Sequence, residues 1–281
     1  MKKKTLLILG GFIFVFSISM NLYIKADYKP VKESYSTIEG LKLNDDQKLY
    51  YQLTKPMKQK IRVSDNHGEA NRVQYITLPK GTIIDGDGGI SDDTRLRSGA
   101  DLSYHLMKKV YKKNTYGPAS VASFMYKPKK MKIVKRPNYL LTDSNNYLFL
   151  GGLKAFSSNK YSSDLLKITS DGYLESYPYN RINFKEGKKE VTLNYLQKPE
   201  SMGKIRFVKS KESVKYFYLK HPMKNIDLKK VKVNHKTYYR ISLNNLKTPY
   251  SKFVTDIPLR IYGDIYKISN ETYYTELTAG G

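Results

Sequence analysis

The chain has 281 residues, with 50 Lys and Arg against 25 Asp and Glu, so its formal net charge is +25 at pH 7. It contains 26 tyrosines but no cysteine and no tryptophan. Because there is no thiol, the composition excludes disulfides, thiol catalysis, lipid attachment at cysteine and cysteine-based zinc sites. The fold must therefore rest on packing alone.

The charge indicates a polyanionic partner. Lysines outnumber arginines 41 to 9. Lysine acts as a hydrated point charge, whereas arginine binds phosphates and bases through two parallel hydrogen bonds. This mixture favours diffuse adhesion to a cell-wall polyanion such as teichoic acid or peptidoglycan, and it makes nucleic acid a less suitable partner. The alternative is that the excess lysine only keeps the protein soluble.

The first 26 residues predict export. Three lysines at positions 2–4 precede the apolar stretch Thr5–Met20, which is the arrangement of a secretory signal peptide. Ala26 supplies a small residue at a cleavage point before Asp27. Removing residues 1–26 takes away four lysines and no acids, which leaves a net charge of +21. We therefore expect an extracellular protein, secreted or associated with the cell surface.

The same segment has a second interpretation as an uncleaved anchor. Leu6–Ile24 comprises 19 residues, and about 20 mostly apolar residues can cross a bilayer as a helix. In that case the protein would stay associated with the membrane, with its polar bulk facing outward.

The rest of the chain is predicted to be mainly β. Residues 27–47 are polar without a sustained period, which indicates a flexible tether. From Tyr50 onward, short runs rich in Tyr, Val, Ile, Thr and Phe alternate with Gly, Pro, Asn and Asp, as in antiparallel strands and turns. Strands are expected at Arg72–Leu78, Thr82–Ile84, Met131–Val134, Tyr147–Leu150, Val191–Leu196, Lys204–Val208, Val214–Leu219, Tyr238–Leu243 and Arg260–Ile268.

One acidic cluster interrupts the basic chain. Asp85, Asp87 and Asp92 lie among glycines, and carboxylates in a flexible loop can hold calcium. The EF-hand pattern is not met, because Gly89 stands at the fifth position and Leu96 at the twelfth. The other interpretation is a glycine-rich connection between strands that binds no metal.

Residues 98–112 predict the one clear helix. Leu102, Leu106, Met107 and Val110 form one apolar stripe, and Ser98 or Asp101 could cap the start. We expect this amphipathic helix to pack against a β module. A basic amphipathic helix of this kind can also lie on a membrane surface.

An internal repeat suggests how the chain is organised. Tyr50–Lys58 aligns with Tyr216–Lys224, and both contain Pro-Met-Lys followed by similar strands. A weaker third copy begins at Tyr126. The predicted units are a β module at 48–113 that includes the helix, a second at 114–210 and a third at 211–281.

A family resemblance appears in these repeats. Asn234–Ser242 resembles the hairpin of bacterial SH3-like modules, and in particular the cell-wall-binding repeats of surface-layer proteins from lactic-acid bacteria. Leu78–Ile84 resembles the segment of those modules in which a Lys-Gly-Thr turn leads into an apolar strand. The chain departs from the pattern at His235, where a turn glycine is usual. The resemblance implies two or three small SH3-like or related antiparallel barrels that bind a wall glycopolymer through basic and aromatic residues.

The candidate ligand residues follow from this expectation. Tyrosine offers a flat apolar face and a hydroxyl, which suits stacking on sugar rings as well as packing in a small barrel. The expected ligand surface combines lysines, an arginine and exposed tyrosines: Tyr75, Lys80, Lys236, Tyr238, Tyr239 and Arg240. Further tyrosines of interest are Tyr173, Tyr177, Tyr179, Tyr262, Tyr266, Tyr273 and Tyr274, and most of the tyrosines are expected to be packing residues.

The sequence contains none of the familiar catalytic motifs. It has no G-x-S-x-G elbow, no H-E-x-x-H helix and no G-x-x-x-x-G-K-[ST] phosphate loop. We therefore expect a non-enzymatic protein that binds the cell envelope and needs no cofactor. The alternatives are an envelope enzyme or membrane-anchored accessory factor with an unrecognised site, and an exported nucleic-acid binder.

Overall fold

The computed structural model describes residues 30–34, 49–63, 72–86, 95–96, 102–113, 124–125, 129–141, 146–157, 163–178, 198–254 and 259–280. The predicted export segment and most of the predicted tether lie outside these residues. The described part of the tether is not flexible, because Val31–Lys32 forms strand β1 and pairs with β16 (Tyr250–Val254). Within them, no helix is long and apolar enough to cross a membrane. The fold is mainly β and its strand pairs are antiparallel, so the predicted fold class is confirmed at this level.

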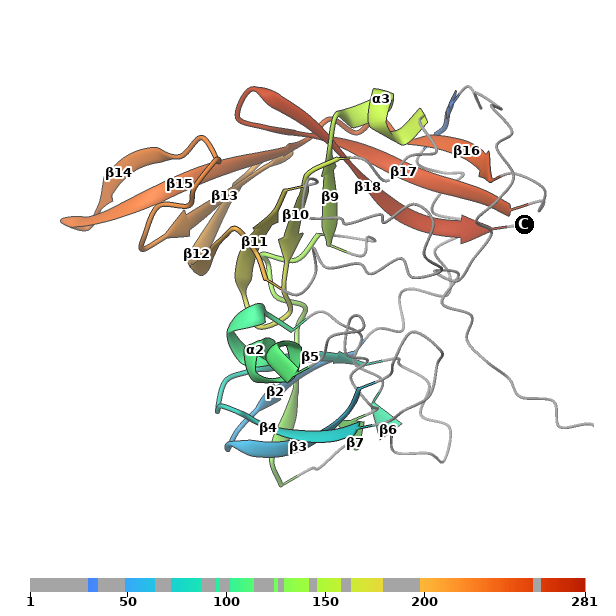
Figure 1. The fold of residues 1–281 in the computed structure, drawn as a ribbon. Helices are drawn as coiled ribbons and strands as arrows, with labels where there is room; N and C mark the ends of the chain where they lie inside the picture. Colours follow the sequence, from blue (N-terminus) through green and yellow to red (C-terminus); the bar gives the residue numbers. More distant parts are fainter. Residues whose placement is uncertain are drawn as a thin grey trace, which may run out of the picture.

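The described residues of the N-terminal part form short sheets and the helix α2 (Figure 1). A three-stranded sheet has the order β5-β2-β8, and β3 pairs with β4 and β6 with β7. The bounds are β2 (Leu49–Leu53), β3 (Met57–Val63), β4 (Arg72–Leu78), β5 (Ile83–Gly86), β6 (Arg95–Leu96), α2 (Tyr104–Lys113), β7 (Phe124–Met125) and β8 (Met131–Val134).

The remaining strands form a single 11-stranded sheet with the order β1-β16-β17-β18-β9-β10-β11-β12-β13-β15-β14. A short helix, α3 (Gly152–Ser157), packs against β17 and β18. The bounds are β1 (Val31–Lys32), β9 (Tyr147–Leu150), β10 (Leu165–Ile168), β11 (Tyr173–Tyr177), β12 (Ser201–Lys211), β13 (Val214–Leu219), β14 (Lys229–Val233), β15 (Lys236–Asn245), β16 (Tyr250–Val254), β17 (Leu259–Ile268) and β18 (Glu271–Gly280).

An additional pairing closes most of this sheet on itself. β15 pairs with β17 through Leu243↔Ile268, so the strands from β17 through β18, β9, β10, β11, β12 and β13 to β15 form a ring. Every strand of the ring contributes an inward side chain to one core, and alternation places the next residue outside. This core contains Leu148, Leu166, Leu174, Ile205, Phe217, Ile241, Ile268 and Tyr273, among others.

The single sheet differs from the expected division at residues 210 and 211. That boundary falls at the end of β12, which forms a hairpin with β13. β9 to β13 therefore belong to one sheet, because hydrogen bonding continues from strand to strand without a break. The structure thus places strands of both predicted C-terminal modules around a common core.

The two Pro-Met-Lys segments share the order of their strands but not their pairing. In the first, β3 and β4 form a hairpin, while β2 pairs with β5 and β8 in another sheet. In the second, β14 and β15 form a hairpin, and β13 pairs directly with β15. The two segments are therefore not the same β unit, although Met57 and Met223 are both buried.

The helix begins later than the sequence suggested. α2 starts at Tyr104, and the backbone carbonyl of Ser103 accepts hydrogen bonds from Leu106 and Met107. The proposed caps at Ser98 and Asp101 lie outside the described residues. Met107 is buried in the N-terminal core with Leu102.

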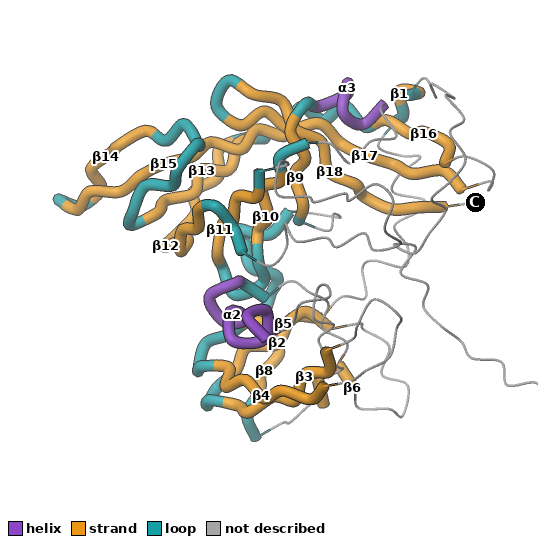
Figure 2. The backbone as a smooth tube through the Cα atoms, in the orientation of Figure 1, coloured by secondary structure: helices purple, strands orange, loops and turns teal. Residues whose placement is uncertain are grey.

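Two carboxylates of the large sheet hold the start of this helix. Asp171 accepts hydrogen bonds from the backbone N–H (2.8 Å) and the hydroxyl (2.5 Å) of Ser103. Glu175 accepts from the backbone N–H of Tyr104 at 2.6 Å. Because the first N–H groups of a helix have no partner within it, acceptors and negative charge at this end are stabilising. These contacts join the N-terminal part to the sheet where α2 meets it (Figure 2).

Candidate functional site: a basic aromatic face

The outer side of β12, β13, β15 and β14 carries aromatic and basic residues in rows. Directly paired residues of antiparallel strands share a face of the sheet. One row consists of Phe207, Tyr218, Arg240 and Lys229. The next row on the same face contains Lys209, Tyr216 and Ser242, and the third contains Lys211, Val214 and Asn244. Successive rows lie about 6.5–7 Å apart along the strands.

The rings of this face contact one another. Phe207 stacks on Tyr218 with centroids 4.3 Å apart, and Tyr238 meets both rings edge-on, at 5.1 and 6.3 Å. These contacts bury Tyr218 to 6% exposure, while Phe207 and Tyr238 stay partly exposed. Edge-to-face and stacked pairs each contribute about 0.5–1.5 kcal/mol beyond area burial. The rings therefore form a fixed cluster.

Two cations on this side of the sheet lie over tyrosine rings. The Arg240 guanidinium is 4.9 Å from the Tyr216 ring centroid, and the Lys209 ammonium is 6.0 Å from that of Tyr218. Lys209 and Lys229 are exposed, and Arg240 is half-buried. We call the set Phe207, Lys209, Lys211, Tyr216, Tyr218, Lys229, Lys236, Tyr238 and Arg240 the basic aromatic face.

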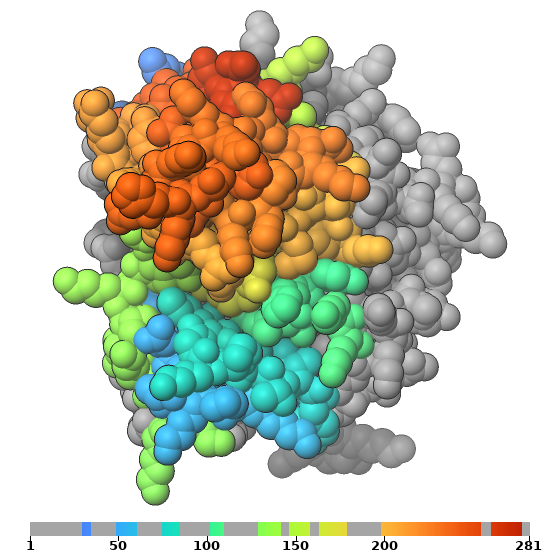
Figure 3. All heavy atoms as spheres, turned by 90° about the vertical axis from the view of Figure 1, so that its left-hand side faces the viewer, coloured from blue at the N-terminus to red at the C-terminus, as the bar shows by residue number. Residues whose placement is uncertain are grey.

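No acidic side chain occurs in the four strands that build this face. They contain ten basic residues, namely Lys204, Arg206, Lys209, Lys211, Lys215, Lys229, Lys230, Lys232, Lys236 and Arg240. Like charges on neighbouring strands repel one another. Of these ten, Lys209, Lys211, Lys229, Lys236 and Arg240 lie on the outer side. The four strands contribute no acid to balance these five cations, so the face attracts anions. Figure 3 shows this region, in orange, as the upper part of the exposed surface.

The inner side of the same strands anchors the face to the core. Phe217 pairs with Ile241, and both are 1% exposed. Lys215 is the polar exception, and its ammonium donates to the backbone carbonyl of Leu140 at 2.7 Å. Burial, together with the positive charge of Arg136, lowers the pKa of Lys215 to about 8. The outer side chains are therefore presented by a rigid support.

A tight turn joins β14 to β15. Asn234 and His235 both have positive φ, at 48° and 61°. Two successive residues of positive φ between antiparallel strands form the type I′ hairpin turn, for which Asn-Gly is preferred. This conformation explains why glycine would be usual at the position of His235.

Three of the predicted ligand residues lie on the basic aromatic face, and one lies on the opposite side of its strand. Lys236, Tyr238 and Arg240 alternate along β15 and share the outer side. Tyr239 lies between them, so it points the other way and packs against the main core. The sequence suggested Tyr238 and Tyr239 as a pair, but the pleat of the strand separates them.

The other two predicted residues lie in the N-terminal part, one on a strand and one in a turn. Tyr75 is on β4 with 58% of its surface exposed, and the Lys58 ammonium is 4.8 Å from its ring centroid. Lys80 is exposed in the turn before β5. The hairpin of β3 and β4 lies at the far end of the molecule from β14 and β15 (Figure 1). The structure therefore does not bring Tyr75 and Lys80 together with the basic aromatic face.

The calcium candidates lie at the margin of the described residues. Asp85 is part of β5, and Asp87 and Asp92 fall outside them. Among the residues that the structure describes, no group of three or more His, Asp or Glu side chains could hold a metal ion. The calcium prediction stays a prediction.

Several members of the face were not predicted from the sequence, namely Phe207, Lys209, Tyr216, Tyr218 and Lys229. A period of two was a usable signal, because it places Phe207, Lys209 and Lys211 on one side of one strand and Tyr216 and Tyr218 on one side of the next. The pairing of strands could not be inferred from this pattern, so the rows could not be assembled.

No family description, curated protein or solved structure matches this chain. The chemistry of the face must therefore be argued from its own geometry.

Proposed function

We propose that this protein is an exported, non-enzymatic protein that binds an anionic polymer of the bacterial cell envelope, such as teichoic acid, through the basic aromatic face. The observation that carries the proposal is the coincidence of aromatic stacking and acid-free positive charge on one side of four strands. A face built only for solubility has no need of stacked, partly exposed rings.

The two kinds of residue would contribute differently to binding. Lysine and arginine attract a polyanion over a distance, and this attraction weakens as salt screens it. Tyr216 and Tyr238 are partly exposed and can pack against the apolar face of a sugar ring. This short-range contact is little affected by salt. The polymer would thus be captured by charge and held by stacking.

The proposal includes an SH3-like role for one hairpin. The hairpin of β14 and β15 carries the segment that resembles SH3-like wall-binding modules, and it supplies Lys236, Tyr238 and Arg240 to the face. We propose that this hairpin has the role that the resemblance implies. The amphipathic helix at α2 would support the fold rather than contact the ligand.

A charge-matched comparison tests the proposal. The face variant Lys209→Gln, Lys229→Gln and Arg240→Gln removes three cations from the basic aromatic face. The control variant Lys55→Gln, Lys108→Gln and Lys109→Gln removes three exposed cations from the N-terminal part. Both lose the same net charge. Binding to purified cell walls, measured by co-sedimentation at low salt, should fall about tenfold or more in the face variant and less than about twofold in the control.

Walls stripped of teichoic acid provide the second arm. The unmodified protein should lose most of its binding to them, and binding to intact walls should weaken as salt rises. An equal loss in both triple variants would mean that net charge alone causes adhesion, and the face would have no special role. Release of soluble wall fragments over time would instead favour the enzyme alternative. Tighter binding to single-stranded nucleic acid than to walls would favour the alternative of an exported nucleic-acid binder.

A further inference from the structure

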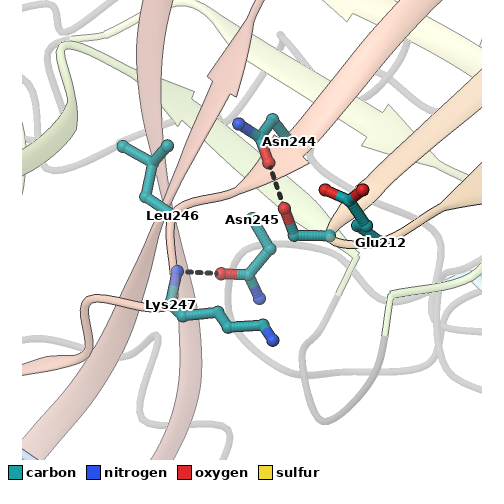
Figure 4. Close-up of a pocket in the computed structure, with 6 residues that line it drawn as sticks. Glu212, Asn244, Asn245, Leu246 and Lys247 are labelled. Carbon is teal, nitrogen blue, oxygen red and sulfur yellow. Dashed lines mark hydrogen bonds between the residues drawn. The ribbon is translucent and has the colours of Figure 1, made fainter.

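An open hollow lies at the end of the basic aromatic face. It has a volume of about 520 Å³ and is lined by Glu212, Ser213, Asn244, Asn245, Leu246 and Lys247 (Figure 4). This volume is within the range of about 300–1,000 Å³ that is common for small-molecule sites. Asn244 is the outward residue of the third row, so the hollow begins where the rows of the face end.

The polar side chains of the hollow are held in place. Ser213 donates from its hydroxyl to the Asn244 amide oxygen at 2.7 Å, and the amide nitrogen of Asn244 points away from this bond (Figure 4). The Asn245 amide oxygen accepts from the backbone N–H of Lys247 at 2.6 Å. Its amide nitrogen donates to the Tyr266 hydroxyl at 3.2 Å. Two side-chain amides are thus fixed before any ligand arrives.

The chemistry of this lining differs from that of the face. Amides, a hydroxyl, the Glu212 carboxylate and the Lys247 ammonium can form hydrogen bonds with hydroxyl groups, which donate and accept. Leu246, which is 38% exposed, offers an apolar contact for carbon-bound hydrogens. Glu212 and Lys247 contribute opposite charges, so the lining has no formal net charge to attract a phosphate. The lining therefore suits a neutral, hydroxyl-rich unit better than an anionic group.

Cations flank this site within the same row. Asn244 pairs with Val214 on one side and with Lys267 on the other, and Val214 pairs with Lys211. Neighbouring strands are about 4.8 Å apart, so Lys267 lies one strand and Lys211 two strands from Asn244. Both lysines are exposed. The row therefore has a positive charge on each side of an amide.

We infer that the hollow binds the polyol or sugar unit of a phosphodiester-linked polymer whose phosphates lie against Lys211, Lys267 and the basic aromatic face. This inference rests on the proposed function and narrows its ligand to polymers in which hydroxyl-rich units alternate with phosphates. Asn244 is the specificity residue, because its fixed amide nitrogen can donate to a hydroxyl of the neutral unit.

Two probes of equal phosphate number test the inference. Poly(glycerol phosphate) carries a hydroxyl-bearing carbon unit between phosphates, and inorganic polyphosphate carries none. The unmodified protein should bind the first about three- to tenfold more tightly than the second in titration calorimetry at fixed salt. Asn244→Ala should remove this preference, since one or two hydrogen bonds correspond to about that factor. Its affinity for polyphosphate should not change.

Matched variants separate a binding role from a structural one. Ser242→Ala lies on the same strand and face, two residues from Asn244, and should keep the full preference. Ser213→Ala frees the Asn244 amide to rotate and should reduce the preference about two- to threefold. Urea midpoints of all variants report on the fold.

The outcomes are distinguishable. A protein that binds both polymers equally, with no effect of Asn244→Ala, would overturn the inference and leave the proposed function standing. An equal loss for both polymers in Asn244→Ala would assign Asn244 a structural role and overturn the inference as well. No binding to either polymer would overturn the proposed function itself. If vesicles containing phosphatidylglycerol bind with the same dependence on Asn244 and soluble poly(glycerol phosphate) does not, the shared chemistry comes from lipid head groups.

Discussion

Two regions of the same closed sheet use tyrosine in opposite ways. In β17 and β18, Tyr262, Tyr266, Tyr273 and Tyr274 are all buried, with between 3% and 8% of their surface exposed. In β13 and β15, Tyr216 and Tyr238 lie on the outer side and stay partly exposed beside cations. The abundance of tyrosine therefore does not identify a ligand surface.

The two regions also differ in their charges. The two strands β17 and β18 contain Arg260 and Lys267 together with Asp264, Glu271 and Glu276. The four strands of the basic aromatic face contain basic residues and no acid. Opposite charges within a sheet compensate one another, whereas charges of one sign project a field. The difference separates a part of the sheet that contains charges of both signs from a part that contains positive charge alone.

Removing a buried ring should have the largest effect on stability. Tyr274 stacks on Phe149 at 5.0 Å and meets Phe156 edge-on at 5.4 Å. We expect Tyr274→Ala to lower the free energy of unfolding by about 3–5 kcal/mol, because it leaves a cavity in a packed core. Tyr216→Ala, on the outer side, should lower it by less than about 1 kcal/mol. Urea unfolding followed by tyrosine fluorescence measures both, and similar losses would contradict the contrast.

Lys215 should make stability depend on pH. Its pKa is about 8 in the folded protein and 10.5 when unfolded, so below pH 8 the folded state bears the full penalty of a buried charge. Between pH 8 and 10 the unfolded state retains more protons, so stability rises with pH. We expect Lys215→Met to remove a rise of about 1–2 kcal/mol, discounted for partial exposure.

The quantity to measure is the difference in free energy of unfolding between the unmodified protein and Lys215→Met, because other groups titrate in both. Burial also raises the pKa of Tyr139 and Tyr273, and this reduces stability above pH 10 in both proteins. Urea midpoints should therefore be compared at pH 7, 8, 9 and 10. Parallel curves would show that Lys215 is not responsible.

Tyr238 and Tyr239 offer a contrast within one strand. Tyr238→Ala should weaken wall binding about three- to tenfold at high salt, where stacking remains and charge attraction is screened. Tyr239→Phe keeps the inward packing and should leave binding unchanged. Co-sedimentation at two salt concentrations provides the test, and an equal effect of the two substitutions would mean that the outer side is not the ligand surface.

The turn at the tip of the hairpin should give the smallest effect. His235 has a φ of 61°, which glycine adopts without the steric penalty of a side chain. We expect His235→Gly to raise the free energy of unfolding by about 0.5–1 kcal/mol and to leave wall binding within about twofold. A loss of stability would show that the His235 side chain makes a stabilising contact. Thermal unfolding monitored by circular dichroism is sensitive enough to detect the difference.

Much of the local structure could be predicted from the chain itself. The strands Arg72–Leu78, Met131–Val134, Tyr147–Leu150 and Val214–Leu219 were expected with the bounds that the structure shows. Runs of β-branched and aromatic residues between turn residues are sufficient for this, because the signal lies within a few neighbouring positions. The expected strand Val191–Leu196 lies outside the described residues.

Part of the candidate site could also be predicted from the sequence. Lys236, Tyr238 and Arg240 were chosen on composition and resemblance, and their alternation along one strand places them on one side. The same reasoning should have excluded Tyr239 as their partner, because the residue between two outward side chains points inward.

What the sequence determined by itself was the positive charge, the β content and the position of many strands, because these depend on residue type and on short-range alternation. Only the tertiary structure decided which strands are neighbours. The row of Phe207, Tyr218, Arg240 and Lys229 depends on the pairing of β13 with β15, which brings two hairpins together. The contacts of Asp171 and Glu175 with the start of α2 join residues that are 68 and 71 positions apart. Such contacts depend on sheet register and ring closure, which arise because all the inward side chains are buried together. Register and closure therefore cannot be inferred from the sequence of any single segment.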